Sequence, residues 1–393
     1  MRRLKTLFFL IAIAVFSACA QHKSGYSLKF EVSQRDFADT ITIDVVGGRV
    51  VVPVMLDGRL FRFMLDTGAA QAVIYSDTPI DGTESAGAVD SYDAVGHRHK
   101  VPMVVLPPFS IGHTTFTGCR ATVHKRPHQG TLFDGIVGFD IICKGLQMKI
   151  DIAARHLVIT DRKHHFAREE GFEAKYHVAP YYHTPYLHVE PFRGFQEEVL
   201  FDTGSNNIYA LSRQSFERAE LEHIPFGPQL EGKARASYAV GLHGREDSLE
   251  VAFLCIDSLK WAGFTFCQLE TKTTQGYSHL GAGLLQYGSV TFLPRKKRVR
   301  FQPYVNQSYV DVCNQQIEKV VESRSGRPTV TFVWPKGKAF AAGLRVGDVL
   351  LKADERPLPF YEDYARYHYL IGRTYTFTVE DRFGFCKEVK MTW

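Results

Sequence analysis

Two copies of the triplet Asp-Thr-Gly carry residues that could do chemistry together. They begin at Asp66 and Asp202, an offset of 136 residues, and each copy ends an apolar run. A single triplet is typical of a tight turn, in which Asp bonds the backbone and Gly supplies a positive φ. Two carboxylates brought close together cannot both ionise easily, so they share one proton. Such a pair can activate water against an amide bond without a metal ion or a covalent intermediate.

The residues beside each Asp could shape and support this pair. Glycine lets the backbone turn sharply, and a threonine hydroxyl can bond to the facing turn. We therefore assign catalysis to Asp66 and Asp202, and the supporting loop residues are Thr67, Gly68, Thr203, Gly204 and Ser205.

Sequence blocks around the two triplets recur in the same order. LFRFMLDTGAAQAVIYS at 60–76 corresponds to EEVLFDTGSNNIYALS at 197–212. In both copies a Ser-Tyr segment with Ala-Val-Gly, an apolar segment with aromatic residues and a Gly-containing segment follow. A repeat of this length predicts one β lobe present twice, with one Asp from each copy meeting at a pseudo-dyad.

Short apolar, β-branched runs broken by Gly, Pro, Asp and Asn dominate the chain beyond residue 28. Examples are Thr40–Val46, Arg49–Met55 and Leu60–Leu65. Their length and spacing predict antiparallel β structure with few helices. We expect a mainly β fold with one lobe at residues 28–160 and a second at 176–303, joined by a charged segment.

The segments around the triplets resemble a known family. FMLDTGAA is similar to the retropepsin form and FDTGSNNIY to the pepsin form, while Ile136-Val137-Gly138 fits the apolar segment behind the first Asp loop. His279-Leu280-Gly281, with Leu284-Leu285, is its looser counterpart in the second copy. Residues 28–303 thus resemble the pepsin/retropepsin superfamily of aspartic peptidases. The resemblance implies duplicated lobes of the acid-protease fold, an aspartic endopeptidase that hydrolyses peptides or proteins, and no cofactor or metal.

The resemblance also implies a β-hairpin flap that covers the substrate and excludes water. Both copies offer a Ser-Tyr segment, so Tyr92 and Tyr238 are the flap candidates. In pepsin-like enzymes only the first lobe carries a flap, whereas both retropepsin subunits do. Both tyrosines could instead be ordinary strand residues.

One difference between the two triplets bears on protonation. Ser205 could donate a hydrogen bond to the Asp202 carboxylate and favour its charged form, whereas Ala69 cannot do so for Asp66. We therefore expect Asp202 to be the ionised partner and the pH optimum to be less acidic than pepsin's.

The last part of the chain departs from the repeat. TVTFVWPKGKAFAAGLRVGDVLLKADERPL at 329–358 resembles a bacterial PDZ domain, which we place at residues 308–393. Such a domain would bind a C-terminal peptide or a partner protein along a sheet edge. The usual carboxylate-binding loop is replaced by Ser323-Arg324-Ser325-Gly326-Arg327, which leaves peptide-tail capture open.

The first twenty residues have the pattern of a secretory signal peptide. A basic start precedes a short apolar run, and Phe16-Ser17-Ala18-Cys19 is similar to a bacterial lipobox. Cys19 would then be lipidated and anchor the protein to a membrane; ordinary cleavage after Ala20 is the alternative. Either route predicts an exported protein of the periplasm or cell envelope. Six further cysteines allow disulfides or buried thiols equally.

Composition and charge exclude several classes of protein. Hydrophobic residues make up 45% and charged residues 23% of the 393 residues, as in soluble globular proteins. A formal net charge of +5 gives no reason to expect nucleic acid, and the basic run at 295–298 is better explained as a solvated strand end. His97/His99 and His164/His165 lack the spacing of a metal site and are interpreted as surface residues.

Two other functions stay open on sequence grounds. The peptidase-like cleft could bind peptides or partner proteins without turnover, together with the PDZ-like domain. In a third hypothesis each lobe acts in an oligomer, as in retropepsins. Because both Asp residues are intact, an active single-chain peptidase is favoured.

Overall fold

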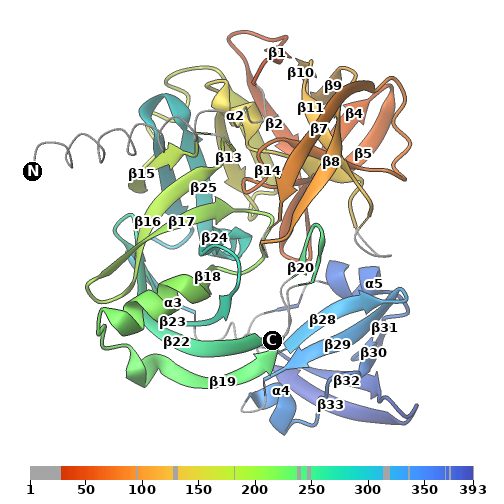
Figure 1. Cartoon of the computed structure of the whole chain (residues 1–393), viewed down its shortest axis with the longest axis vertical. Helices are drawn as coiled ribbons and strands as arrows, with labels where there is room; N and C mark the ends of the chain where they lie inside the picture. Colours follow the sequence, from red (N-terminus) through yellow and green to blue (C-terminus); the bar gives the residue numbers. More distant parts are fainter. Residues whose placement is uncertain are drawn as a thin grey trace, which may run out of the picture.

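The computed structural model describes residues 28–93, 96–126, 132–180, 182–236, 240–245, 249–312, 319–334, 337–367, 369–370 and 373–392. The predicted leader at 1–20, with Cys19, lies outside these residues. The described chain is mainly β, which confirms the predicted class. Figure 1 shows two larger β regions above and to the left, and a smaller β domain at the C-terminal end.

The first lobe is built on one eleven-stranded sheet within the described residues. Its strands follow the order β1-β10-β9-β4-β5-β12-β6-β11-β8-β7, with β3 paired to β4. Their bounds are β1 Glu31–Val32, β3 Asp44–Val46, β4 Arg49–Leu56, β5 Arg59–Leu65, β6 Ala72–Tyr75, β7 Glu84–Tyr92, β8 Arg98–Val105, β9 Phe109–Ile111, β10 Thr114–Thr117, β11 Arg120–His124 and β12 Gly135–Val137.

A second sheet, with fourteen strands among the described residues, runs through the second lobe and into the first. Its order is β19-β22-β23-β18-β24-β17-β16-β15-β26-β25-β13-β14-β2, and β27 pairs with β23. Strands from both halves of the chain therefore share one hydrogen-bonded layer. The bounds are β2 Ala38–Thr42, β13 Gln147–Asp151, β14 His156–Thr160, β15 Phe172–Val178, β16 Pro185–Phe192, β17 Phe195–Asp202, β18 Tyr209–Ser212, β19 Leu230–Ala236, β22 Leu249–Trp261, β23 Phe264–Thr274, β24 His279–Gly281, β25 Gly288–Leu293, β26 Arg298–Pro303 and β27 Tyr309–Asp311.

The predicted strand at Thr40–Val46 is two strands that belong to different sheets. Residues of β2 pair with β14, whereas Asp44 begins β3 and pairs with Val51 of β4. Ile43 lies between them and donates its backbone N–H to Arg155 O over 3.0 Å. An apolar pattern alone does not show where a chain passes from one layer to the next.

The two lobes repeat one arrangement of strands around each triplet. In the first lobe, β12 runs parallel to β5 and antiparallel to β6, which is itself parallel to β11. In the second, β24 runs parallel to β17 and antiparallel to β18, which is parallel to β23. The structure thus shows the duplication that the sequence blocks predict.

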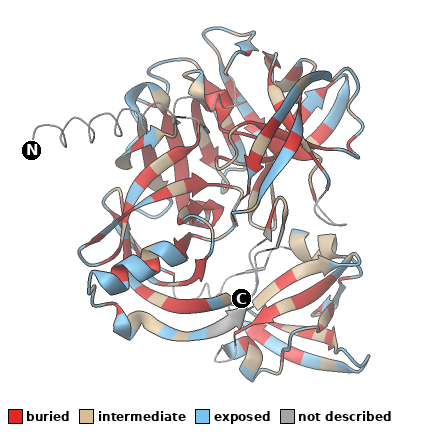
Figure 2. Ribbon diagram, viewed as in Figure 1, coloured by how far each residue is buried: buried red, intermediate tan, exposed pale blue. Residues whose placement is uncertain are grey.

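Aromatic side chains join the two lobes into one core. Phe139 of the first lobe packs against Phe292, with ring centroids 5.2 Å apart, and Phe292 packs against Phe201 at 5.3 Å. All three are nearly inaccessible to solvent. Figure 2 shows buried residues concentrated where the strands of the two lobes meet. Burial of this apolar area is the main force that holds the halves together.

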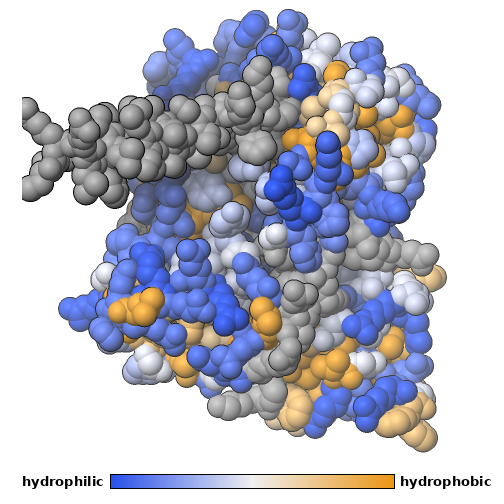
Figure 3. All heavy atoms as spheres, in the orientation of Figure 1, coloured by the Kyte–Doolittle hydropathy of each residue, from blue (hydrophilic) through white to orange (hydrophobic). Residues whose placement is uncertain are grey.

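The C-terminal domain has its own sheet and core. Its strands follow the order β28-β29-β30-β32-β33, with β31 paired to β30. Figure 3 shows hydrophobic patches over the lower right part of the molecule, where this domain lies, and its exposed apolar residues include Phe360, Phe383 and Phe385. The strands are β28 Lys319–Arg324, β29 Arg327–Val333, β30 Val349–Ala353, β31 Arg356–Pro357, β32 Thr374–Glu380 and β33 Cys386–Thr392.

Helices in the described residues are short. Four are α-helices and three are 3₁₀-helices, and none of them is long and apolar enough to cross a membrane. Their bounds are α2 Asp140–Cys143, α3 Arg213–Leu221, η2 Gly227–Gln229, η3 Ala282–Gln286, η4 Pro294–Lys296, α4 Lys338–Ala341 and α5 Tyr361–Arg366.

Candidate active site

Asp66 stands directly after β5, where the neighbouring strand β12 fixes its backbone. Its N–H donates to Val137 O over 3.0 Å. The N–H groups of Gly68 and Ala69 then turn back and donate to its carboxylate Oδ1, over 2.8 and 3.2 Å. The predicted apolar segment behind the first Asp loop is therefore the strand that holds this loop.

Asp202 ends β17 in the corresponding place of the second lobe. It lies opposite Gly281 of β24 in the parallel pair, and the Gly204 N–H donates to its Oδ1 over 2.8 Å. A Cβ on Gly281 would meet Asn207 O at 2.3 Å, so the strand approaches the loop too closely for any other residue. His279-Leu280-Gly281 thus occupies the place that the looser sequence match predicts.

The two Thr side chains cross between the loops. Thr67 Oγ1 donates to Phe201 O over 2.6 Å, and Thr203 Oγ1 donates to Leu65 O over 2.7 Å. Each hydroxyl also accepts the other threonine's backbone N–H, over 3.0 and 3.1 Å. Both side chains are fully buried. Four reciprocal bonds shielded from water fix the two loops against each other.

The carboxyl groups of Asp66 and Asp202 meet in the middle of this arrangement. A Cβ on Gly68 would lie 2.7 Å from Asp202 Cγ, and one on Gly204 would lie 2.6 Å from Asp66 Oδ2. Burial, the charge of Asp202 and a hydrogen bond with its carboxyl group raise the pKa of Asp66 well above the usual range, against the opposing effect of the Gly68 and Ala69 N–H groups. Two touching carboxyl groups cannot both ionise easily, so this pair can hold one shared proton.

Ser205 follows Asp202 as predicted, but its hydroxyl has other partners. His279 Nε2 lies 3.0 Å from Ser205 Oγ, and the Asn207 N–H donates to the same oxygen over 3.4 Å. Besides the hydrogen bond with Asp66, the Asp202 carboxylate accepts one from the Gly204 N–H. The direct bond that we expected from Ser205 to Asp202 is replaced by one to His279, because β24 brings this imidazole beside the loop.

Hairpins from both lobes meet near the dyad. Tyr92 ends β7, is about half exposed, and packs against the ring of Tyr182 with centroids 6.2 Å apart. Tyr238 lies outside the described residues. The second hairpin is seen in β20 Val240–Gly241 and β21 Gly244–Arg245, and Leu242 in its turn packs on the first-lobe cluster that lies beside Ala69. The flap role of both tyrosines stays a prediction.

The contact between these hairpins consists of one carboxylate and several imidazoles. Asp93 Oδ2 accepts the His243 N–H over 3.0 Å, and His243 Nε2 lies 3.2 Å from Ser91 Oγ. The His243 ring stacks on His99, with centroids 4.4 Å apart, and lies 5.2 Å from His124. His99 is exposed, as the sequence predicts, whereas His124 and His243 were not predicted because only the fold brings the three residues together.

These histidines do not amount to a metal site. Within the described part of the chain, no group of His, Cys, Asp or Glu residues has the geometry to hold a metal ion. Burial and the neighbouring imidazoles lower the pKa of His124 to about 4, and burial lowers that of His243. His124 and His243 are therefore uncharged at neutral pH and pack as neutral imidazoles.

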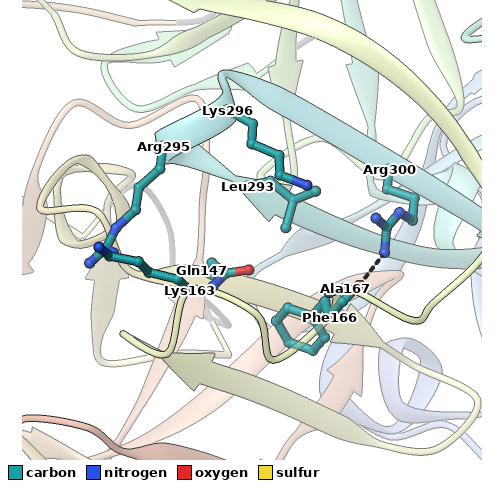
Figure 4. A pocket seen from close by; sticks show the side chains of 8 residues that line it. All are labelled: Gln147, Lys163, Phe166, Ala167, Leu293, Arg295, Lys296 and Arg300. Atoms are coloured by element: carbon teal, nitrogen blue, oxygen red, sulfur yellow. Dashed lines mark hydrogen bonds between the residues drawn. The ribbon is translucent and has the colours of Figure 1, made fainter.

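The basic run at 295–298 borders a pocket whose lining residues include neither Asp66 nor Asp202. Figure 4 shows Lys163, Arg295 and Lys296 around an open pocket, with Arg300 at one side. Arg300 is buried, donates to Phe166 O over 2.8 Å and forms a 2.7 Å ion pair with Glu173. The other three cations are exposed in the turn η4 and a neighbouring loop.

The first Asp loop lies in a stretch of the chain that matches a known protein family. Residues 52–141 match a family of aspartyl proteases. The matched stretch contains Asp66, the crossed Thr67 and the strand behind them, whereas Asp202 lies beyond it. The first lobe is therefore similar in sequence to aspartyl proteases, and the second lobe repeats its strand arrangement around Asp202.

Over the whole chain, sequence similarity to known proteins is low. No curated protein sequence matches it. Among solved structures, the basic 7S globulin from soybean is similar, with a TM-score of 0.45 and 11% sequence identity, over 68% of this chain and 95% of that one.

Proposed function

We propose that this protein is an aspartic endopeptidase in which Asp66 and Asp202 activate water together. The ionised Asp202 takes a proton from a bound water while the protonated Asp66 polarises the scissile carbonyl. The resulting diol collapses when the leaving nitrogen is protonated. No covalent enzyme intermediate is formed, and the substrate is a peptide or an extended segment of a protein.

One observation carries this proposal: the two carboxyl groups share a hydrogen bond at the junction of the lobes. The crossed threonine bonds hold the two loops together, and Gly68 and Gly204 let the carboxyl groups approach each other. A structural turn does not require two buried acids in contact, because one unpaired buried charge is already costly. A water-activating dyad does require them, and the aspartyl protease match over the first lobe agrees with this chemistry.

Peptide cleavage tests the proposal directly. Purified protein is offered a peptide library between about pH 3 and 7, with and without a statine-type inhibitor, and products are identified by mass spectrometry. Asp66→Asn and Asp202→Asn are each expected to abolish cleavage, because one dyad needs both groups. Cleavage that survives either single change would reject a shared dyad.

A binding protein without turnover is the alternative outcome. In that case the wild-type chain and both Asn variants would hold the same peptides, and none of them would release fragments. Isothermal titration with the statine-type inhibitor separates the two functions, because an isostere of the diol gains affinity only where a working dyad is present.

Two further parts of the chain belong to this proposal. The C-terminal domain acts as a PDZ-like module that binds an extended peptide at a sheet edge, of which β28 and β33 are the two ends in the described sheet. The leader directs the protein out of the cytoplasm, and Cys19 anchors it as a lipoprotein of the cell envelope. Metabolic labelling with a fatty acid, in wild type and Cys19→Ala, tests the anchor.

A further inference from the structure

The tight turn between β3 and β4 lies between the second Asp loop and the C-terminal domain. Gly47 and Gly48 form this turn with φ of 58° and 77°, a left-handed conformation that favours glycine, and Val46 pairs with Arg49 on either side. A turn with two glycines keeps its shape only where neighbours hold it. Its neighbours come from both other parts of the molecule.

On one side the turn contacts the loop of Asp202. Arg49 Nε donates to Gly204 O over 2.7 Å, and Asn206 Nδ2 lies 3.4 Å from Gly47 O. A Cβ on Gly48 would lie 3.1 Å from Asn206 Cβ, so the turn packs closely against the Asn206 side chain. Gly204 is also the residue whose N–H holds the Asp202 carboxylate. Arg49 therefore restrains the same glycine that orients Asp202.

On the other side the turn contacts helix α5 of the C-terminal domain. The Gly47 N–H donates to Ala365 O over 3.1 Å. Tyr361 and Ala365 pack against the first-lobe cluster that contains Val46 and Val51. Burial raises the pKa of Tyr361, and the charge of Arg49 opposes this rise, so the two side chains interact electrostatically.

We propose that Arg49 is a positioning residue for the Asp202 loop, and that helix α5 of the C-terminal domain holds Arg49 in place through the β3–β4 turn. The inference rests on the proposed function of the dyad. It assigns the C-terminal domain a part in catalysis beyond peptide binding: α5 must be docked for the second Asp to stand in its working position.

The physical reason is the freedom of the loop itself. Gly204 has no side chain because the Asp66 carboxylate occupies that space, and its backbone is correspondingly easy to displace. The hydrogen bond from the Arg49 guanidinium to the Gly204 carbonyl restricts this backbone motion next to Asp202. A shift of about 1 Å in a catalytic group can cost about 100-fold in rate, so a modest loosening is enough to be measured.

The first experiment replaces Arg49 in the full-length protein. Arg49→Met keeps the packing of the side chain and removes the donor, and Arg49→Lys keeps the charge without the guanidinium. We expect Arg49→Met to lower kcat about tenfold with little change in KM, and Arg49→Lys to lie between it and wild type. Hydrogen exchange of the peptide that covers residues 203–206 should quicken in the same order, while the melting temperature changes little.

The second experiment undocks the helix without touching Arg49. Ala365→Asp places a carboxylate in the apolar contact, and the matched control Arg366→Gln changes the exposed neighbour on the same helix. Ala365→Asp should quicken exchange in residues 47–49 and 203–206 and lower kcat, whereas Arg366→Gln should resemble wild type. Exchange in β32 and β33 reports whether the domain stays folded; if it does not, Tyr361→Ala is the milder variant.

The outcomes separate this inference from the proposed function. If wild type cleaves nothing, the exchange measurements still decide whether α5 and Arg49 restrain the second Asp loop. If wild type cleaves peptides but Arg49→Met retains both its kcat and its slow exchange at 203–206, the inference is overturned and the peptidase proposal stands. Normal exchange at 203–206 in folded Ala365→Asp or Tyr361→Ala would likewise reject the part assigned to α5.

Discussion

At the scale of single residues, the two aspartates stand in repeated loops but differ in their surroundings. Asp66 accepts two backbone N–H groups, yet burial and the contact with Asp202 raise its pKa. Beside Asp202, the Ser205 hydroxyl is directed to His279. The two carboxyl groups therefore have different neighbours although the local sequences are alike. The chemical difference between the two aspartates comes from residues that contact their loops, such as His279 beside Ser205.

Glycine at the dyad is required for space. We expect Gly204→Ala to abolish cleavage, because its Cβ would lie 2.6 Å from Asp66 Oδ2 and would push the two carboxyl groups apart. Gly227→Ala is the matched control, since a Cβ there meets nothing within 4 Å and the φ is not positive. Initial rates on one peptide substrate compare the two. An active Gly204→Ala enzyme would show that the carboxyl groups need not touch.

The raised pKa of Asp66 would set the pH range of the proposed activity. The working state has one proton on the dyad, and it is lost when Asp66 ionises as the pH rises. A raised pKa moves this upper limb of the rate profile to higher pH, so we expect an optimum clearly less acidic than pepsin's. The dependence of kcat/KM on pH measures it. A profile with its peak near about pH 2 would contradict this assignment.

At the scale of elements, the two hairpins make contact through groups that the sequence does not connect. Asp93 follows β7, His243 lies in the turn after β20, and His124 ends β11. The Asp-Thr-Gly loops could be predicted because each motif is local and is repeated. This contact could not, because it depends on two loops from different lobes arriving at one place. The docking of α5 on the β3–β4 turn was missed for the same reason.

Acid should weaken this contact. The folded pKa of His124 is about 4, below the value of about 6.5 in an unfolded chain, so the unfolded state gains a proton first as the pH falls. Stability linked to His124 is complete above about pH 6.5 and is lost progressively toward pH 4, on the order of 3 kcal/mol in all.

Thermal unfolding at a series of pH values tests this expectation. His124→Gln should lose less of its melting temperature between about pH 7 and 4.5 than wild type does, because the group that titrates in that window is gone. The control His164→Gln changes an exposed histidine and should keep the wild-type slope. If the melting temperatures of all three proteins fall in parallel as the pH is lowered, His124 does not account for the loss of stability in acid.

At the scale of the whole molecule, the C-terminal domain is attached to both lobes. Helix α5 contacts the first lobe, and Trp334 stacks on Phe253 of the second, with ring centroids 4.0 Å apart. The sequence predicts a separate domain at residues 308–393, and the structure shows a separate core in this part of the chain. Its attachment could not be read from the chain, because Phe253 and Trp334 look like ordinary strand residues in their own segments.

Removal of the stacked indole should loosen this attachment. We expect Trp334→Ala to cost about 3 kcal/mol, as for other large buried aromatic side chains, and to separate the unfolding of the C-terminal domain from that of the lobes. Differential scanning calorimetry would then show an additional transition at lower temperature. Phe385→Ala, at a ring that is 72% exposed in the same domain, should leave the wild-type trace unchanged. Identical traces for Trp334→Ala and Phe385→Ala would show that the Phe253–Trp334 stack does not stabilise the attachment of the C-terminal domain.

The fused lobes have a consequence for how a bound chain is oriented. A symmetric pair of subunits presents the same groups to a peptide whichever way it lies. Here Ala69 stands on one side of the midline, and Ser205 with His279 stands on the other. A peptide lying across Asp66 and Asp202 would meet different residues on the amino and carboxyl sides of the scissile bond. It would therefore be cleaved in one orientation only.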